Sequence, residues 1–93
     1  MPQTKHERAL AKFQENRLDE AETLLREALE EDESAELWND WATVKAALNQ
    51  LTDARSGYEK ALKLKPGNQY IQQNYDLFRE ADDKRNRKNK KKP

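Results

Sequence analysis

Apolar residues recur along the chain at helical spacing, in five segments separated by short polar breaks. Within 17–30 and 50–63 they fall at offsets 0, 3, 7, 10 and 11, which form one face of an α-helix. The residues on the two stripes are Leu18, Ala21, Leu25, Ala28 and Leu29, and Leu51, Ala54, Tyr58, Ala61 and Leu62. A shift of 33 residues superposes one stripe on the other, which indicates an internal repeat.

Start and stop signals place the ends of these helices. Thr4 with Glu7 suits a capping box, and Ser34 and Asn68 suit N-caps. Pro66 and its neighbours form a stop-and-restart signal. We therefore predict helices near residues 4–15, 18–31, 34–48, 51–64 and 68–84, with short connections that make neighbouring helices antiparallel.

The fifth segment repeats the apolar positions of the third with a shift of 34 residues, apart from two polar replacements. Gln72 stands in place of Trp38, and Asp76 in place of Ala42. A polar residue at a packing position is tolerated where no further helix covers it, as at the end of a repeat array. We therefore interpret the fifth helix as a terminal cap.

The segment 36–68 resembles the tetratricopeptide repeat, a family built from a 34-residue helix–turn–helix unit. Lys45 stands where the family usually has tyrosine, and we expect this departure to loosen the inner face. The resemblance is weaker over the first unit, which lacks the leading tryptophan and the closing proline, and partial over the last helix. It rests on the positions that the family uses for packing: Trp38, Trp41, Ala42, Ala54, Tyr58, Ala61 and Pro66.

The resemblance implies an all-α fold in which antiparallel helix–turn–helix repeats form a short right-handed α-solenoid of five helices. The repeat domain would span residues 4–83. Its parts are a first repeat at about 4–33, a second at about 34–67 and a capping helix at about 68–84, with a disordered basic tail at 85–93. Members of the family bind peptides or partner proteins in a concave groove, and catalysis is not expected of them.

Two roles are open for the paired tryptophans of the third helix. One is an aromatic platform for a proline-rich, cationic or nucleobase ligand. The other is that of large wedges packed between successive helices. Because Trp38 and Trp41 both fall on packing positions of the family, we favour packing, with a rim left exposed, more at Trp38 than at Trp41.

The resemblance also implies which side chains face a ligand in the concave groove: Leu10, Phe13, Gln14, Asn39, Thr43, Ala46, Gln73 and Leu77. The alternative is that Phe13 and Leu77 complete the small core, and both interpretations stay open at this point. Family members that bind a C-terminal carboxylate use a cationic clamp. The matching positions here are His6, Leu10, Asp40, Tyr70 and Asn74, so we predict no such clamp.

The net charge of the 93-residue chain is zero, but its charges are unevenly distributed. The stretch 84–92 contains no acidic residue and seven basic ones: Lys84, Arg85, Arg87, Lys88, Lys90, Lys91 and Lys92. Subtracting these from 18 leaves 11 basic residues against 18 acidic ones, a body charge of −7. The basic stretch is typical of a segment that attracts nucleic acid, an anionic membrane or an acidic protein. A solubilising tail, or one that folds back on the acidic second and third helices, is the alternative.

The sequence shows no arrangement typical of catalysis. His6 is the only histidine, and without a nucleophile or a second ligand nearby we expect it to be solvent-exposed. The acidic stretch 27–36 lacks the spacing of a calcium loop, and the chain has no cysteine and no glycine-rich phosphate loop. We therefore predict a protein that is not an enzyme, with no metal and no cofactor. No stretch is apolar enough to span a membrane, so we expect a cytoplasmic protein, or a nuclear one because of the tail.

The leading hypothesis is a tetratricopeptide-like adaptor that binds a peptide or a partner protein. One alternative is a nucleic-acid-associated factor that binds through the basic tail. Another is a self-associating scaffold, homodimeric or engineered, because an open repeat array has two ends that could stack or exchange helices.

Overall fold

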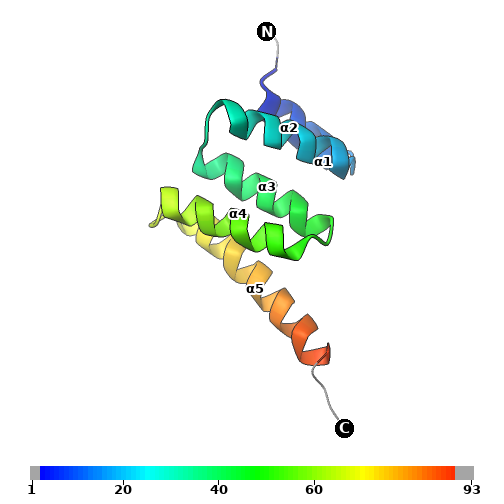
Figure 1. Cartoon of the computed structure of the whole chain (residues 1–93), viewed down its shortest axis with the longest axis vertical. Coiled ribbons are helices and arrows are strands. Elements are labelled where there is room, and N and C mark those ends of the chain that lie inside the picture. Colours follow the sequence, from blue (N-terminus) through cyan, green and yellow to red (C-terminus); the bar gives the residue numbers. More distant parts are fainter. Residues whose placement is uncertain (1–2, 90–93) are drawn as a thin grey trace.

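The computed structural model describes residues 3–89 and shows five α-helices arranged along the long axis of a molecule of 59 × 30 × 19 Å (Figure 1). The helices are α1 (Lys5–Gln14), α2 (Leu18–Glu31), α3 (Ala35–Ala47), α4 (Leu51–Leu64) and α5 (Gln69–Asn89). Each helix packs against the next, and α5 also contacts α3. The predicted all-α fold of five helices is confirmed.

The predicted N-caps form the expected hydrogen bonds. Thr4 Oγ1 accepts from the Glu7 amide at 3.0 Å, while Glu7 Oε1 accepts from the Thr4 amide at 2.9 Å, which completes the capping box. Ser34 Oγ accepts from the third amide of α3 at 3.1 Å. Asn68 Oδ1 accepts from the Ile71 amide at 2.9 Å. Local sequence therefore fixes where α1, α3 and α5 begin.

The α1–α2 and α3–α4 connections have the same backbone conformation. Asn16 and Asn49, 33 residues apart, are the two residues with positive φ among the non-glycine residues described, at 63° and 64°. The amide that follows each one donates to the carbonyl five residues earlier, at 2.8 and 2.9 Å. Asparagine tolerates this left-handed conformation better than most residues, and the bonding pattern is that of a Schellman motif. The repeat seen in the apolar pattern thus extends to the turns.

The core consists of three apolar clusters in a row rather than a single centre. The first joins α1, α2 and α3 around Leu25, the second joins α3, α4 and α5 around Tyr58, and the third surrounds Ile71. Small side chains let the helices approach closely at the contacts. Fully buried alanines at these contacts are Ala9, Ala21, Ala42, Ala54 and Ala61.

The two tryptophans have the packing role that the pattern favours. Trp38 and Trp41 meet edge to face, with ring centroids 5.5 Å apart, and both pack against the first cluster while remaining half-buried. The interpretation of Pro66 as a packing residue is wrong, because its side chain is exposed. It lies in the turn after α4, where a fixed φ and a missing amide proton prevent the helix from continuing.

The outer face of α5 is polar, as expected of a cap. Gln72 and Asp76 are exposed, and Gln72 Nε2 donates to Asp76 Oδ1 at 3.0 Å. The opposite face buries Ile71 and Phe78 against the preceding helices. Within the described part of the chain, no helix covers the polar face.

α5 is longer than the sequence pattern predicts. It continues to Asn89 instead of ending near residue 84, so residues 85–89 are helical where we expected a disordered tail. Lysine and arginine are good helix formers, and positive side chains near a helix C-terminus interact favourably with its dipole. Figure 1 shows these last turns projecting beyond the other helices. The remaining tail residues, Lys90, Lys91 and Lys92, lie outside the described residues.

Candidate functional site

The face formed by α1, α3 and α5 carries a run of three adjoining clefts, which we call the α1/α3/α5 groove. The middle cleft, of about 200 Å³, shares Leu10, Asp40 and Tyr70 with a cleft of about 300 Å³. It shares Thr43 and Asn74 with a cleft of about 340 Å³ at the other side. Neighbouring clefts thus have lining residues in common, and the three lie in a row on this face.

Six of the predicted groove residues line these clefts: Leu10, Phe13, Asn39, Thr43, Ala46 and Leu77. Leu77 has 65% of its surface exposed, so it does not complete the core. Phe13 both lines the middle cleft and packs against the first apolar cluster. The two predicted glutamines, Gln14 and Gln73, are exposed but do not line these three clefts.

Asn39, one of the predicted groove residues, lines the 300 Å³ cleft but is almost fully covered. Its surface is only 1% exposed, and its Oδ1 accepts from Asn74 Nδ2 at 3.0 Å. Its own Nδ2 donates to Asp40 Oδ1 at 3.2 Å. The side chain is covered because α5 packs against α3 at this point. Asn39 therefore holds the floor of the groove rather than presenting a free amide.

The expectation that His6 is solvent-exposed is wrong. Its side chain is 33% exposed, and its Nε2 lies 2.6 Å from Asp40 Oδ2, which joins α1 to α3. The Asn39–Asn74 bond joins α3 to α5 in the same way, from positions 33 and 34 residues further along the chain. Each first helix of a repeat is thus bonded to the next by a polar pair at the same register.

The α1/α3/α5 groove also contains residues that the sequence analysis did not assign to it. Tyr70, Asp40 and Asn74 line the middle cleft, and Tyr70 has 65% of its surface exposed. These positions entered the sequence argument only as a test for a carboxylate clamp. Asp40 and Asn74 are related by the 34-residue shift between the third and fifth helices. This relation in the sequence could have placed both residues on the same face.

Tyr58 forms part of the floor of the 340 Å³ cleft. The residue is 4% exposed, and its Oη lies 2.9 Å from Thr43 Oγ1. Burial raises the pKa of Tyr58, against a smaller opposing effect of the Thr43 hydrogen bond. Burial also raises the pKa of Tyr75, which packs beside it with ring centroids 5.8 Å apart.

We expect the protein to lose stability at alkaline pH partly through Tyr58. A raised pKa in the folded state means that folding favours the neutral phenol, so this contribution is complete below the ordinary tyrosine pKa of about 10 and is lost as pH rises further. Urea unfolding at pH values from 8 to about 11.5 measures it. The decline should be shallower in Tyr58→Phe than in the wild type. Equal slopes in the two proteins would contradict the assignment.

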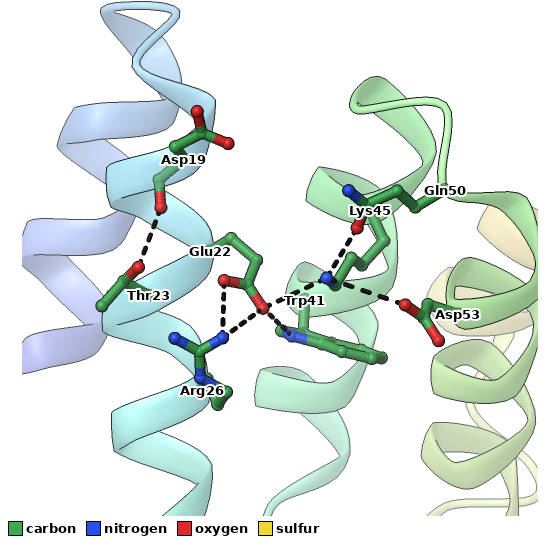
Figure 2. A network of polar contacts seen from close by, with 8 residues as sticks. All are labelled: Asp19, Glu22, Thr23, Arg26, Trp41, Lys45, Gln50 and Asp53. Carbon is green, nitrogen blue, oxygen red and sulfur yellow. Dashed lines mark hydrogen bonds and ion pairs between the residues drawn. The ribbon is translucent and has the colours of Figure 1, made fainter.

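A second polar network joins α2, α3 and α4 away from the groove, and Figure 2 shows it. Glu22, 7% exposed, accepts from Trp41 Nε1 at 3.1 Å and from Arg26 at 3.0 Å. Lys45 Nζ lies 3.3 Å from Glu22 and 3.7 Å from Asp53. Among the described residues, every buried side-chain nitrogen and oxygen has a hydrogen-bond partner.

This network corrects the expectation that Lys45 loosens the inner face. The Lys45 side chain is only 12% exposed, and its Nζ donates to Gln50 at 2.7 Å in addition to the two ion pairs. The residue lies on the side of α3 that faces α2 and α4, not on the groove side. It therefore ties three helices together.

Two of the predicted tail residues are placed with their side chains. Arg85 lines the 340 Å³ cleft, and its Nη1 lies 3.8 Å from Asp82 Oδ1, while Lys84 is exposed on α5. Arg87 and Lys88 belong to the last turns of α5. The basic stretch therefore begins at the end of the groove as part of a helix.

Residues 3–89 contain no group of three or more histidine, cysteine, aspartate or glutamate side chains placed to hold a metal ion. No helix in this part of the chain is long and apolar enough to cross a membrane. Comparisons with protein families, with curated proteins and with solved structures gave no match. The geometry of the α1/α3/α5 groove is therefore the main indication of a function.

Proposed function

We propose that the protein is a non-catalytic, tetratricopeptide-like adaptor that binds a peptide or a partner protein in the α1/α3/α5 groove. The observation that carries the proposal is the distribution of exposed apolar residues. Large apolar side chains that are exposed within residues 3–89 are Leu10, Leu64, Tyr70 and Leu77, and all but Leu64 line this groove. Apolar residues gathered in a hollow are typical of a recognition surface, whereas scattered ones need no explanation.

The repeated helix hairpin supports the tetratricopeptide-like part of the proposal. Two hairpins have the same left-handed asparagine 33 residues apart, and their first helices are linked by equivalent polar pairs. Stacking hairpins in this way aligns the first helices on one face, which is how repeat proteins create extended binding surfaces. We place the binding surface on those helices for this reason.

The ends of the array favour an adaptor over a self-associating scaffold. The outer face of α1 and α2 has a cleft lined mainly by charged residues, including Arg8, Lys12 and Glu27. The outer face of α5 presents Gln72 and Asp76. Stacking two copies end to end would bury charged and amide groups with little apolar area in return. Nucleic-acid binding through the basic stretch is the second candidate, and the helical start of that stretch on α5 is compatible with it.

Replacing Leu77 with aspartate should weaken the capture of groove-binding peptides while leaving the fold intact. Leu77 is 65% exposed, so the charge costs little stability, but it would sit in the apolar 340 Å³ cleft. Peptides selected on the wild-type protein from a displayed random library would be measured by fluorescence anisotropy. We expect a loss of at least about tenfold in affinity, since a carboxylate must lose its water when an apolar ligand covers it.

Leu64→Asp is the matched control, because Leu64 is also exposed, at 50%, but lies outside the groove. A second control removes residues 86–93 and leaves the groove residue Arg85 in place. Both controls should bind peptide as the wild type does. If Leu64→Asp weakens binding as much as Leu77→Asp, or if only the truncation abolishes it, the groove is not the binding site and the tail hypothesis is favoured.

A further inference from the structure

The middle of the α1/α3/α5 groove combines apolar walls with one carboxylate. Leu10, Asp40 and Tyr70 line both the 200 and the 300 Å³ clefts, and Phe13 adds an aromatic wall to the first. We call the hollow around these four residues the Asp40 pocket. Its rim is accessible, since Leu10 is 40% and Tyr70 65% exposed.

No lysine or arginine lines either of these two clefts within the described chain. Besides Asp40, their ionisable side chains are His6, Glu36 and Tyr70. Glu36 is already bonded to Lys65 Nζ at 2.6 Å from outside the hollow. Apart from the His6 imidazole at 2.6 Å, the described side chains that line these two clefts offer Asp40 no nitrogen of a basic residue.

Asp40 is held in place but retains hydrogen-bonding capacity. One of its oxygens lies 2.6 Å from His6 Nε2, and the other accepts from Asn39 Nδ2 at 3.2 Å. A carboxylate has about four acceptor positions, so both oxygens can accept further hydrogen bonds. The side chain is 22% exposed, which leaves it within reach of a ligand.

We propose that the Asp40 pocket takes a lysine or arginine side chain of the bound peptide, flanked by apolar residues of that peptide. The inference rests on the proposed function of the groove and names the class of its ligand. Leu10, Phe13 and Tyr70 suit the aliphatic stem of such a side chain, and the rings suit its cation. The carboxylate accepts from the ammonium or guanidinium group.

Asp40 could bind the ligand or only tie α1 to α3, and two variants distinguish these roles. Asp40→Asn and His6→Gln both break the pair that ties α1 to α3, but only Asp40→Asn removes the carboxylate. Glu27→Gln removes one negative charge from an exposed residue outside the groove and controls for general attraction. A phage-displayed library of random dodecapeptides would be selected on the wild type and on each variant.

We expect peptides enriched in lysine or arginine between apolar residues from the wild type, from His6→Gln and from Glu27→Gln, but not from Asp40→Asn. A selected peptide, synthesised with norleucine in place of its basic residue, should bind the wild type about fivefold more weakly, and this penalty should vanish on Asp40→Asn. An equal penalty on both proteins would overturn the inference. Selection of apolar peptides that are not enriched in lysine or arginine would also overturn it. If Leu77→Asp failed to bind such peptides, they would still support the adaptor proposal. Selection of no groove-dependent peptide overturns both proposals.

Discussion

Replacing Gly57 with alanine will destabilise the protein by about 1–3 kcal/mol, although alanine is the better helix former by about 1 kcal/mol. A Cβ atom at this position would lie 2.9 Å from Ala42 Cβ and 2.9 Å from Trp41 Cε3. Such distances are shorter than ordinary van der Waals contact, so α3 and α4 must separate or the tryptophan must turn. Gly57 marks the close approach of the two helices.

Neither neighbour can move away without a cost. Ala42 is fully buried and has no side-chain torsion that could shift its Cβ. The Trp41 ring is held by the hydrogen bond from its Nε1 to Glu22 and by edge-to-face contact with Trp38. The overlap is therefore expected to outweigh the gain in helix propensity.

Chemical denaturation followed by far-ultraviolet circular dichroism measures this effect, and Gly67→Ala is its control. A Cβ at Gly67 would meet no atom within 4 Å, and Gly67 does not have a positive φ. That substitution should be neutral or stabilise the protein by up to about 1 kcal/mol, because alanine restricts the unfolded chain. If Gly57→Ala proved as stable as Gly67→Ala, this would contradict the claim that α3 and α4 approach too closely at Gly57 to admit a Cβ atom.

Replacing Glu22 with alanine should cost about 2–3 kcal/mol. Glu22 receives the Trp41 indole hydrogen bond and lies 3.3 Å from Lys45 Nζ, in a site where both charged side chains are about one-tenth exposed. Without the carboxylate, the indole N–H loses its partner, and Lys45 keeps its hydrogen bond to Gln50 but only a distant ion pair, with Asp53 at 3.7 Å. Leaving buried polar groups unpaired costs more than the net worth of the pair. Urea unfolding gives the free energy.

Two further variants test this explanation. Arg26 bonds to the same carboxylate but is 53% exposed, so Arg26→Ala should change stability by no more than about 0.5 kcal/mol. Replacing both partners, as Glu22→Leu with Lys45→Met, should recover part of the stability lost in Glu22→Ala, because no ammonium group is then left without its carboxylate, although the Trp41 indole N–H stays unpaired. A double variant no more stable than Glu22→Ala would show that shape, not charge, determines the loss.

The predictions that the structure confirms depend on local sequence. The apolar stripes beginning at Leu18 and Leu51 define two helices, and the side chains of Thr4, Ser34 and Asn68 set the starts of the others. Helical spacing and capping act over three to five residues, so the chain carries this information in neighbouring positions. The length of α5 was misjudged because a basic stretch was equated with disorder, whereas its residues have good helix propensity.

The site depended on contacts between residues far apart in the chain. The sequence by itself determined the helices, the 33-residue repeat and the small residues at helix contacts. The family resemblance implied six residues that line the clefts. Only the tertiary structure decided that Asn39 is buried, that His6 meets Asp40, and that Gly57 lies against Trp41. These facts depend on how closely two helices approach and on which turn of one meets which turn of the other. The packing of whole helix faces sets how closely two helices approach. Apolar periodicity identifies which face of a helix is buried, but it does not determine which turn of the neighbouring helix that face meets.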